Sequence, residues 1–309
     1  MYSKSVTDLS KLSKDEVKRF LDSFDTVVSD CDGVLWIMGA PIPGSAEVLQ
    51  KLRDLGKRIF YVTNNSTKTR DEFLDYGRGM KFTINKDEII SSAYLTACYL
   101  KSINFQGKVY VVGSEGITKE LDEIHIKHVG VGPDPCSSLP DALNFVIDPE
   151  VRAVVVGMDK YFSYSKMLKA ATYLNNLEVL FIGTNTDERF PASGSKILPG
   201  TGSLLRAVEC CSLRKATIMG KPSSYVGTVL VNEYKINPER TLIIGDRCNT
   251  DIILGSKCGF KSLLVLTGVT TLSEVQQYKK SEKEDDKDLI PDVYLKSLGD
   301  LLPFLTTNE

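Results

Sequence analysis

Short apolar runs alternate with longer segments of helical periodicity along most of the 309-residue chain. The runs at 24–30 and 58–63 have the length of strands, and the segments at 44–56 and 86–103 repeat apolar residues with the spacing of helices. Later runs of strand length lie at 108–113, 152–158, 178–183, 241–246 and 262–268. Continuous runs of Val, Ile and Leu are typical of parallel strands that are buried on both faces. The alternation therefore predicts an α/β fold with doubly wound parallel sheets.

The number of predicted strands exceeds what one compact sheet of this kind needs, so the pattern predicts a second α/β unit. Residues 104–215 have their own alternation of strands and helices, and the segments on either side of them carry the chemically suggestive motifs. An inserted domain explains both features. We therefore predict a first core segment at 1–103, an inserted α/β domain at 104–215 and a second core segment at 216–309.

Composition places the chain among soluble globular proteins, with 42% hydrophobic and 25% charged residues. The net charge of −2 gives no basic excess for nucleic acid, and no polybasic tract favours an anionic membrane. The N-terminus has no apolar signal core, and no apolar run approaches the roughly 20 residues of a membrane helix. The seven cysteines have no regular spacing, which predicts reduced thiols and a cytoplasmic location.

Polar and charged side chains lie where four strand-length runs end, namely those at 24–30, 58–63 and 241–246 and a short one that ends at Ile218. They are Asp30 and Asp32, then Thr63, Asn64 and Asn65, then Lys221, and finally Asp246 and Asp251. Each group alone is typical of a turn or a helix cap. However, ligands of open α/β sheets bind at the carboxyl ends of the strands. The occurrence of all four groups in this order, each closing a buried strand, indicates one site.

The chemistry that needs this set of side chains is phosphoryl transfer. Asp30 and Asp32 would repel each other at the end of one strand unless a cation lay beside them. Carboxylates without nearby soft ligands suit Mg²⁺, which would keep Asp30 ionised so that it can attack phosphorus as a nucleophile. Mg²⁺, Lys221, the Thr63 hydroxyl and the backbone N–H groups that open into Gly33 could stabilise the charge of the phosphoryl group.

Asp32 is predicted to have a separate role from Asp30. Because the chain turns at Gly33, Asp32 cannot easily face phosphorus from the same side as Asp30. It can instead protonate the leaving oxygen and then accept a proton from the water that cleaves the aspartyl phosphate. This division between a nucleophile and a general acid/base is the central mechanistic hypothesis.

These motifs resemble those of the haloacid dehalogenase (HAD) superfamily of hydrolases. The four stretches are DCDGVLW at 30–36, TNNS at 63–66, GKP at 220–222 and GDRCNTDI at 245–252. Further stretches are similar to the group of phosphoglycolate, pyridoxal and p-nitrophenyl phosphatases, namely GTNTDERFP at 183–191, PGTGSLLRAVE at 199–209 and LTGV at 266–269. The resemblance covers nearly the whole chain. It implies a Rossmann-like core, a large inserted α/β cap of the C2 type, and a cytosolic homodimer formed through the cap.

The resemblance also implies which residues hold the metal and the phosphate. Mg²⁺ would be held by the Asp30 carboxylate, the Asp32 backbone carbonyl and the Asp246 carboxylate, with Asp251 in support. Phosphate would be held by Thr63, Asn64, Asn65 and Lys221. The partner is thus expected to be a small phosphorylated metabolite.

Residues of the predicted cap are expected to select the substrate. Where the pyridoxal phosphatases have a histidine this chain has Phe190, which resembles the phosphoglycolate phosphatases more. Arg189 could pair with the carboxylate of a small anion, or it could be a surface or interface residue. The lead substrate is therefore 2-phosphoglycolate, with p-nitrophenyl phosphate also hydrolysed. The alternatives are a pyridoxal phosphate or glycerol phosphate phosphatase, a phosphotransferase or phosphomutase, and a non-catalytic binding protein on the same fold.

Overall fold

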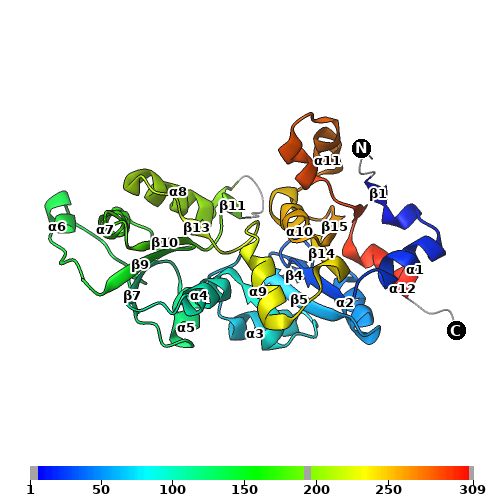
Figure 1. The fold of residues 1–309 in the computed structure, drawn as a ribbon, viewed down its shortest axis with the longest axis horizontal. Helices are drawn as coiled ribbons and strands as arrows, with labels where there is room; N and C mark the ends of the chain where they lie inside the picture. Colours follow the sequence, from blue (N-terminus) through cyan, green and yellow to red (C-terminus); the bar gives the residue numbers. More distant parts are fainter. Residues whose placement is uncertain (1–5, 191–195, 306–309) are drawn as a thin grey trace. The chain divides into compact units, whose positions relative to one another are not determined.

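The computed structural model describes residues 6–190 and 196–305, which fall into two compact units (Figure 1). The first unit comprises the chain up to Thr63, Leu74–Ile90 and the chain from Pro222 onward, and the second comprises Asn64–Phe73 and Ser91–Lys221. Each unit has a sheet of mainly parallel strands with helices packed against it, which confirms the predicted α/β fold class. The boundaries of an inserted cap at 104 and 215 stay a prediction.

The first unit is built on a seven-stranded sheet in the order β1–β16–β15–β14–β2–β5–β6. The strands are β1 (Thr7–Asp8), β16 (Val293–Leu295), β15 (Lys261–Val265), β14 (Thr241–Gly245), β2 (Thr26–Ser29), β5 (Arg58–Thr63) and β6 (Ile89–Ser91). The pairs from β1 across to β5 are parallel, and Ser29 of β2 lies level with Ile244 of β14 and Tyr61 of β5. The carboxyl ends of β5, β2 and β14 therefore lie at one edge of the sheet.

The helices of the first unit bury their apolar faces against this sheet and against one another. They are α1 (Lys14–Asp22), α2 (Ser45–Asp54), α3 (Arg70–Gly79, which begins in the second unit), α9 (Tyr225–Tyr234), α10 (Ile253–Cys258), α11 (Leu272–Lys280) and α12 (Leu302–Leu305). Short 3-10 turns lie at η1 (Leu9–Lys11), η2 (Lys86–Glu88), η3 (Pro238–Arg240), η5 (Glu284–Leu289) and η6 (Leu298–Leu301). The predicted helix at 44–56 is confirmed, and its apolar spacing buries Val48, Leu49 and Leu52.

The predicted helix at 86–103 is wrong in its first third. The segment begins with the turn η2, continues as β6 at the edge of the sheet, and becomes α4 only at Ser92–Ser102. Ile89 and Ile90 are completely buried as strand residues, and the Ser91 side chain accepts from Tyr94 N to cap the helix. Tertiary burial thus overrides a local helical pattern here.

The second unit has a five-stranded parallel sheet in the order β13–β10–β9–β7–β8. Its strands are β13 (Thr217–Ile218), β10 (Leu180–Gly183), β9 (Val151–Val156), β7 (Lys108–Val112) and β8 (His128–Val129). Its helices, besides α4, are α5 (Glu115–Asp122), α6 (Leu139–Leu143), α7 (Tyr164–Leu174) and α8 (Thr201–Ser212). Side chains of β7, β9 and α7, among them Val112, Val154 and Leu174, form the core of this unit.

Two short hairpins complete the fold, β3 (Trp36–Ile37) with β4 (Ala40–Pro41) and β11 (Arg189–Phe190) with β12 (Leu198–Pro199). Both hairpins begin within stretches that the sequence motifs single out, at Trp36 of DCDGVLW and at Arg189 of GTNTDERFP. Across residues 6–190 and 196–305, every helix is too short or too polar to span a membrane.

Candidate active site

Three of the predicted acids meet in the first unit. Asp30 directly follows β2, Asp246 directly follows β14, and Asp251 lies on η4 (Cys248–Ile252), a single π-helical turn. One carboxylate oxygen from each of them lies within 4.8 Å of the others. Asp246 and Asp251 are buried, whereas Asp30 is half-buried. Three carboxylates at this spacing repel one another, and a bound cation would remove that repulsion.

Gly33 lets the chain after β2 pass close to Asp246. Its φ of +89° lies in the left-handed region, and a Cβ at this position would lie 2.6 Å from Asp246 Oδ2. The turn is closed by Gly33 N, which donates to Trp36 O at 2.8 Å. Thr267 Oγ1 donates to Gly33 O at 2.5 Å. Any side chain at position 33 would therefore displace either the turn or the Asp246 carboxylate.

The loop after β15 holds Asp246 in place. Val269 N donates to Asp246 Oδ2 at 2.8 Å, and Thr270 N donates to the Asp246 carbonyl at 2.9 Å. Arg247 N donates to Asp251 Oδ2 at 3.1 Å. Sequence reasoning missed Val269 and Thr270 as site residues, and the resemblance of LTGV to the phosphatase group was the signal that could have found them. Val269 N and Arg247 N thus each fix a carboxylate oxygen, and Thr270 N fixes the Asp246 backbone, before any ligand binds.

The carboxylate of Asp32 is held apart from the acid cluster. Asp32 is exposed, and its Oδ1 accepts from the Trp36 indole N–H at 3.1 Å. Trp36 is buried, with its ring edge-on to Tyr76 at 5.5 Å and to Phe82 at 5.3 Å. Burial and, after it, the charge of Asp32 raise the pKa of Tyr76. Trp36 was missed from sequence, although it is the only tryptophan and lies four residues after Asp32.

The predicted phosphate residues lie in both units. Thr63 is the buried last residue of β5 in the first unit. In the second unit, Asn64 Nδ2 donates to the Lys221 carbonyl at 3.0 Å, and Lys221 is 2% exposed. Asn65 Oδ1 accepts from Thr67 N at 2.8 Å and from Thr67 Oγ1 at 2.7 Å. The structure thus brings Asn64 and Lys221 together, while Asn65 shapes the turn that follows.

The predicted substrate residues form a strand of the second hairpin. Arg189 and Phe190 make up β11, in register with Pro199 and Leu198 of β12. Arg189 is exposed and Phe190 is partly buried. Because it is exposed, the Arg189 guanidinium can meet an anion that arrives from solvent.

Two cysteines lie near the acids. Cys31 is fully buried between Asp30 and Asp32 in the chain. Burial, together with the charges of Asp251, Glu274 and Asp246, raises the pKa of Cys248 to about 12 against the opposing effect of a hydrogen bond with Thr270. The Cys248 thiol is therefore neutral near pH 7 and a poor metal ligand. The donor set is oxygen only, which fits Mg²⁺.

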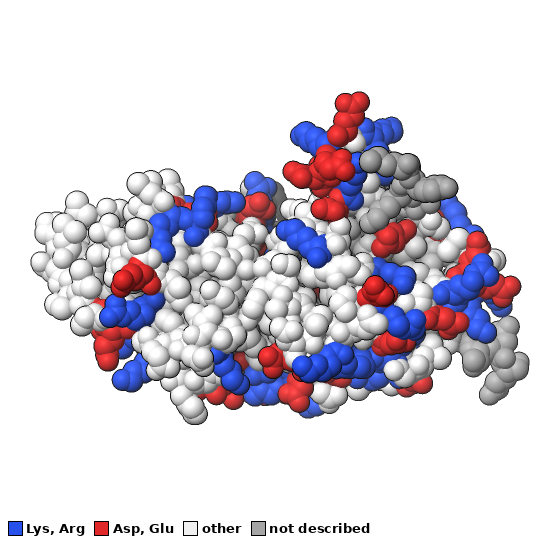
Figure 2. Space-filling view, viewed as in Figure 1, with Lys and Arg blue, Asp and Glu red and all other residues white. Residues whose placement is uncertain are grey.

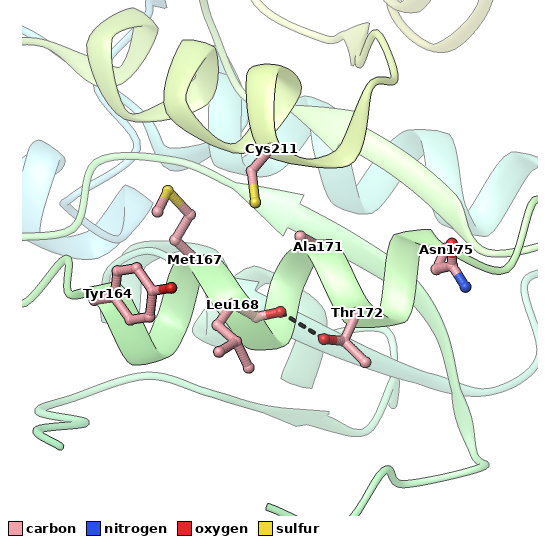
Figure 3. A pocket seen from close by; sticks show the side chains of 7 residues that line it. All are labelled: Tyr164, Met167, Leu168, Ala171, Thr172, Asn175 and Cys211. Atoms are coloured by element: carbon pink, nitrogen blue, oxygen red, sulfur yellow. Dashed lines mark hydrogen bonds between the residues drawn. The ribbon is translucent and has the colours of Figure 1, made fainter. Parts of the chain in front are cut away.

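A pocket elsewhere in the second unit has a different character (Figure 3). Its volume is about 350 Å³, and it lies between α7 and α8. It is lined by Tyr164, Met167, Leu168, Ala171, Thr172, Asn175 and Cys211. Most of these side chains are apolar and none is an acid, so this pocket is not the place for phosphoryl chemistry.

Comparison with known proteins identifies the family. A model described as haloacid dehalogenase-like hydrolase matches residues 87–259, another of the same description matches 27–127, and an HAD-hydrolase-like model matches 218–301. The chain is 42% identical over 306 residues to the glycerol-3-phosphate phosphatase of Homo sapiens, covering 96% of this chain and 95% of that one.

Solved structures agree with this result. The 4-nitrophenylphosphatase of Thermotoga maritima is 27% identical, with a TM-score of 0.75 over 92% of this chain and 98% of that one. A glycerol phosphate phosphatase of Mycobacterium tuberculosis, solved in complex with magnesium, shares the fold at 24% identity, with a TM-score of 0.76 over 91% of this chain and 78% of that one.

The fold and the acid cluster therefore define a hydrolase of the Rossmann-like α/β class with an additional cap sheet. The chain belongs to the haloacid dehalogenase-like hydrolase family, as its sequence motifs predict. The prediction that it is a phosphatase is also confirmed.

Proposed function

We propose that this phosphatase is a Mg²⁺-dependent phosphomonoester hydrolase of small phosphorylated metabolites, with glycerol 3-phosphate as its lead substrate. The observation that carries the proposal is the acid cluster of Asp30, Asp246 and Asp251, with the Asp32 carboxylate held separately by Trp36. The lead substrate is taken from the name of the human relative that is 42% identical.

The metal is assigned to the acid cluster. Asp30, the Asp32 carbonyl and Asp246 would hold Mg²⁺, with Asp251 in support. When bound there, Mg²⁺ supplies positive charge that offsets the carboxylates and polarises a phosphoryl oxygen. The matched structure that contains magnesium supports this assignment at the level of the fold.

Asp30 and Asp32 have separate roles in the reaction, and other residues bind the phosphate. Asp30 forms the new P–O bond with its carboxylate as the bond from phosphorus to the alcohol oxygen breaks, and Asp32 donates the proton that this oxygen takes. Asp32 then removes a proton from water, which attacks the phosphorus of the aspartyl phosphate and frees Asp30 and inorganic phosphate. Thr63, Asn65 and Lys221 are assigned to the phosphate oxygens, because hydroxyl, amide and ammonium groups donate to them.

The lead substrate differs from the one expected from sequence. Phe190 and Arg189 favour 2-phosphoglycolate, whereas the relatives with 42% identity carry glycerol-3-phosphate in their names. Both compounds are small phosphate esters, and only 2-phosphoglycolate has a carboxylate for Arg189. We therefore keep 2-phosphoglycolate as the second candidate.

A panel of esters tests the proposal. Phosphate release is measured with glycerol 3-phosphate, 2-phosphoglycolate, pyridoxal phosphate and p-nitrophenyl phosphate, with Mg²⁺ and after its removal by a chelator. We expect the highest kcat/KM for glycerol 3-phosphate, and no release without the metal. Full activity in the chelator would contradict the metal assignment, and a clear preference for pyridoxal phosphate would contradict the substrate assignment.

Arg189→Ala should separate the two candidate substrates. Loss of a charge-assisted hydrogen bond to a carboxylate should lower kcat/KM for 2-phosphoglycolate by about tenfold. The value for glycerol 3-phosphate should change by less than about twofold, because this substrate has no carboxylate. Lys196→Ala is the matched control, because it also removes a positive charge from an exposed residue, two positions before β12 of the same hairpin. An equal loss of kcat/KM for both substrates would show that Arg189 does not bind the carboxylate of 2-phosphoglycolate.

We also propose a cytoplasmic homodimer formed through the second unit. Cys136, Cys210, Cys211, Cys248 and Cys258 are free thiols, as is usual in a reducing compartment. Around α6, large apolar side chains are exposed: Leu139 by 56%, Leu143 by 61%, Val146 by 89% and Ile147 by 54%. Figure 2 shows few charged side chains at the end of the unit that carries α6. A largely apolar surface of this kind, with Asp141 as the exposed charge of α6, suits a second copy of the chain.

Leu143→Asp with Val146→Asp should convert the dimer into a monomer, because a second copy would have to bury two new charges. The mass in solution, measured by light scattering after size exclusion, should fall by half. Leu55→Asp is the control, since Leu55 is 55% exposed in the first unit. A wild-type protein that is already monomeric at micromolar concentration would contradict the proposed dimer.

A further inference from the structure

The stretch GTNTDERFP at 183–191 contains two polar residues to which the proposed reaction gives no role, Asn185 and Asp187. We infer that Asp187, supported by Asn185, is a positioning residue that fixes Asn64 and the Lys221 backbone relative to the hairpin carrying Arg189. The inference rests on the proposed function and deepens it. All of these residues belong to the second unit.

The first observation is the set of acceptors around the Asn64 amide. Asn64 is only 9% exposed, and its Nδ2 donates to Asp187 Oδ2 at 3.1 Å and Oδ1 at 3.3 Å. The same nitrogen donates to the Lys221 carbonyl at 3.0 Å. Both amide hydrogens are therefore directed within the protein. Asn64 acts on the phosphate through Lys221, in contrast to the direct contact implied by the family resemblance.

Asp187 decides the orientation of that amide. A flipped amide would set Asn64 Oδ1 against the Asp187 carboxylate and the Lys221 carbonyl, oxygen facing oxygen. In the observed orientation Oδ1 points toward Gly220, where a Cβ would lie 2.5 Å from it. Within the described residues Asn64 Oδ1 accepts no hydrogen bond. The Asp187 carboxylate thus selects, together with the Lys221 carbonyl, one of two amide orientations.

Asn185 holds the backbone on either side of this contact. It is completely buried, and its Nδ2 donates to the Asn64 carbonyl at 2.7 Å and to Thr201 Oγ1 at 3.2 Å. Its Oδ1 accepts from Asp187 N at 3.1 Å. Asn185 therefore joins the Asn64 segment to the backbone that presents Asp187. Buried polar networks with satisfied members specify one arrangement of their segments.

The same backbone is the base of the substrate hairpin. Gly202 N at the start of α8 donates to the Asp187 carbonyl at 2.8 Å, and β11 begins two residues later at Arg189. Through Asn64, the Asp187 carboxylate thus links the backbone of a predicted phosphate residue, Lys221, to the segment that leads into a predicted selectivity residue, Arg189. Its loss should loosen phosphate binding for every ester, whatever the alcohol.

Inorganic phosphate is the probe that isolates this effect, because it reports on the phosphate ligands alone. In the full-length protein, Asp187→Ala should raise the inhibition constant of phosphate and the KM of p-nitrophenyl phosphate by about tenfold, as for loss of a charged hydrogen bond. Glu188→Ala is the matched control, since it removes the same charge from the next, exposed residue. Asp187→Asn keeps one acceptor oxygen and should recover most of the loss.

A double-variant cycle tests whether Asp187 acts through Asn64. Asn64→Ala should resemble Asp187→Ala, and the double variant should be no worse than either single variant. A residue that only stabilises the fold would lower the melting temperature and leave the phosphate inhibition constant unchanged. Additive effects, or an inhibition constant for Asp187→Asn and Asp187→Ala equal to that of Glu188→Ala, would overturn the inference. A wild-type protein that hydrolyses no ester would instead refute the proposed function, and the inference with it.

Discussion

An Asp30→Asn variant should hydrolyse p-nitrophenyl phosphate about 10⁴-fold more slowly than the wild type, in line with the loss of other enzymatic nucleophiles. The amide cannot attack phosphorus, and the change also removes one of the three carboxylates of the acid cluster. Because Asn has the size of Asp, the sheet should fold unchanged. Initial rates of phosphate release at saturating Mg²⁺ measure the effect, and an unaltered melting transition confirms the fold.

Asp32→Asn is the matched control for this prediction. It leaves the nucleophile in place and keeps an oxygen for the Trp36 indole N–H. With p-nitrophenyl phosphate, whose leaving group needs no proton, the variant should still transfer the phosphoryl group to Asp30. With glycerol 3-phosphate this transfer should be far slower, because the leaving alcohol oxygen needs the proton that Asp32 supplies. Turnover by Asp30→Asn at the wild-type rate would refute the assigned nucleophile. Equal losses for both esters in the rate of phosphoryl transfer to Asp30, measured before the aspartyl phosphate is hydrolysed, would refute the assigned acid.

Asp159→Ala should lower the free energy of unfolding by about 3–5 kcal/mol, the cost of leaving one partner of a buried ion pair alone. Lys166 of α7 is fully buried, and its Nζ donates to Asp159 Oδ2 at 2.5 Å. Tyr161 N donates to the other carboxylate oxygen at 2.8 Å. The variant would leave the Lys166 ammonium without its counter-charge in the core of the second unit. Urea denaturation followed by circular dichroism measures the change.

The double variant of Asp159→Ala with Lys166→Met should recover a large part of this loss, since both charges are then absent. Lys169→Met, which removes the partner of Asp134 from the same helix, should cost less than about 1 kcal/mol, because this pair is partly exposed, Lys169 by 21% and Asp134 by 27%. A double variant less stable than Asp159→Ala alone would show that the ion pair does not explain the effect.

The prediction of the fold from sequence was correct where burial follows from the apolar pattern alone. The runs at 58–63 and 241–246 became β5 and β14 because each is apolar on both faces and ends in polar residues. The prediction of one helix at 86–103 was wrong at its start, because a strand and a helix adjoin there without a break in apolar periodicity. The Ser91 cap was the signal for the true start of the helix.

The acid cluster was predictable because parallel neighbouring strands bring their carboxyl ends to one edge of the sheet. The residues that orient the site were not. Trp36 reaches back to Asp32 across the tight turn at Gly33, and Asp187 reaches Asn64 from 123 positions along the chain. The first contact depends on the left-handed conformation of that turn and the second on tertiary structure, neither of which a single sequence displays.

The central claim is that catalysis passes through a phosphorylated Asp30. The most direct measurement is mass spectrometry of peptides after the wild-type enzyme is mixed with p-nitrophenyl phosphate and quenched in acid within one turnover. We predict a peptide containing Asp30 that is heavier by one phosphoryl group, at higher occupancy in Asp32→Asn and absent from Asp30→Asn. Rapid turnover without any phosphorylated peptide, or with the phosphoryl group on another residue, would contradict the mechanism.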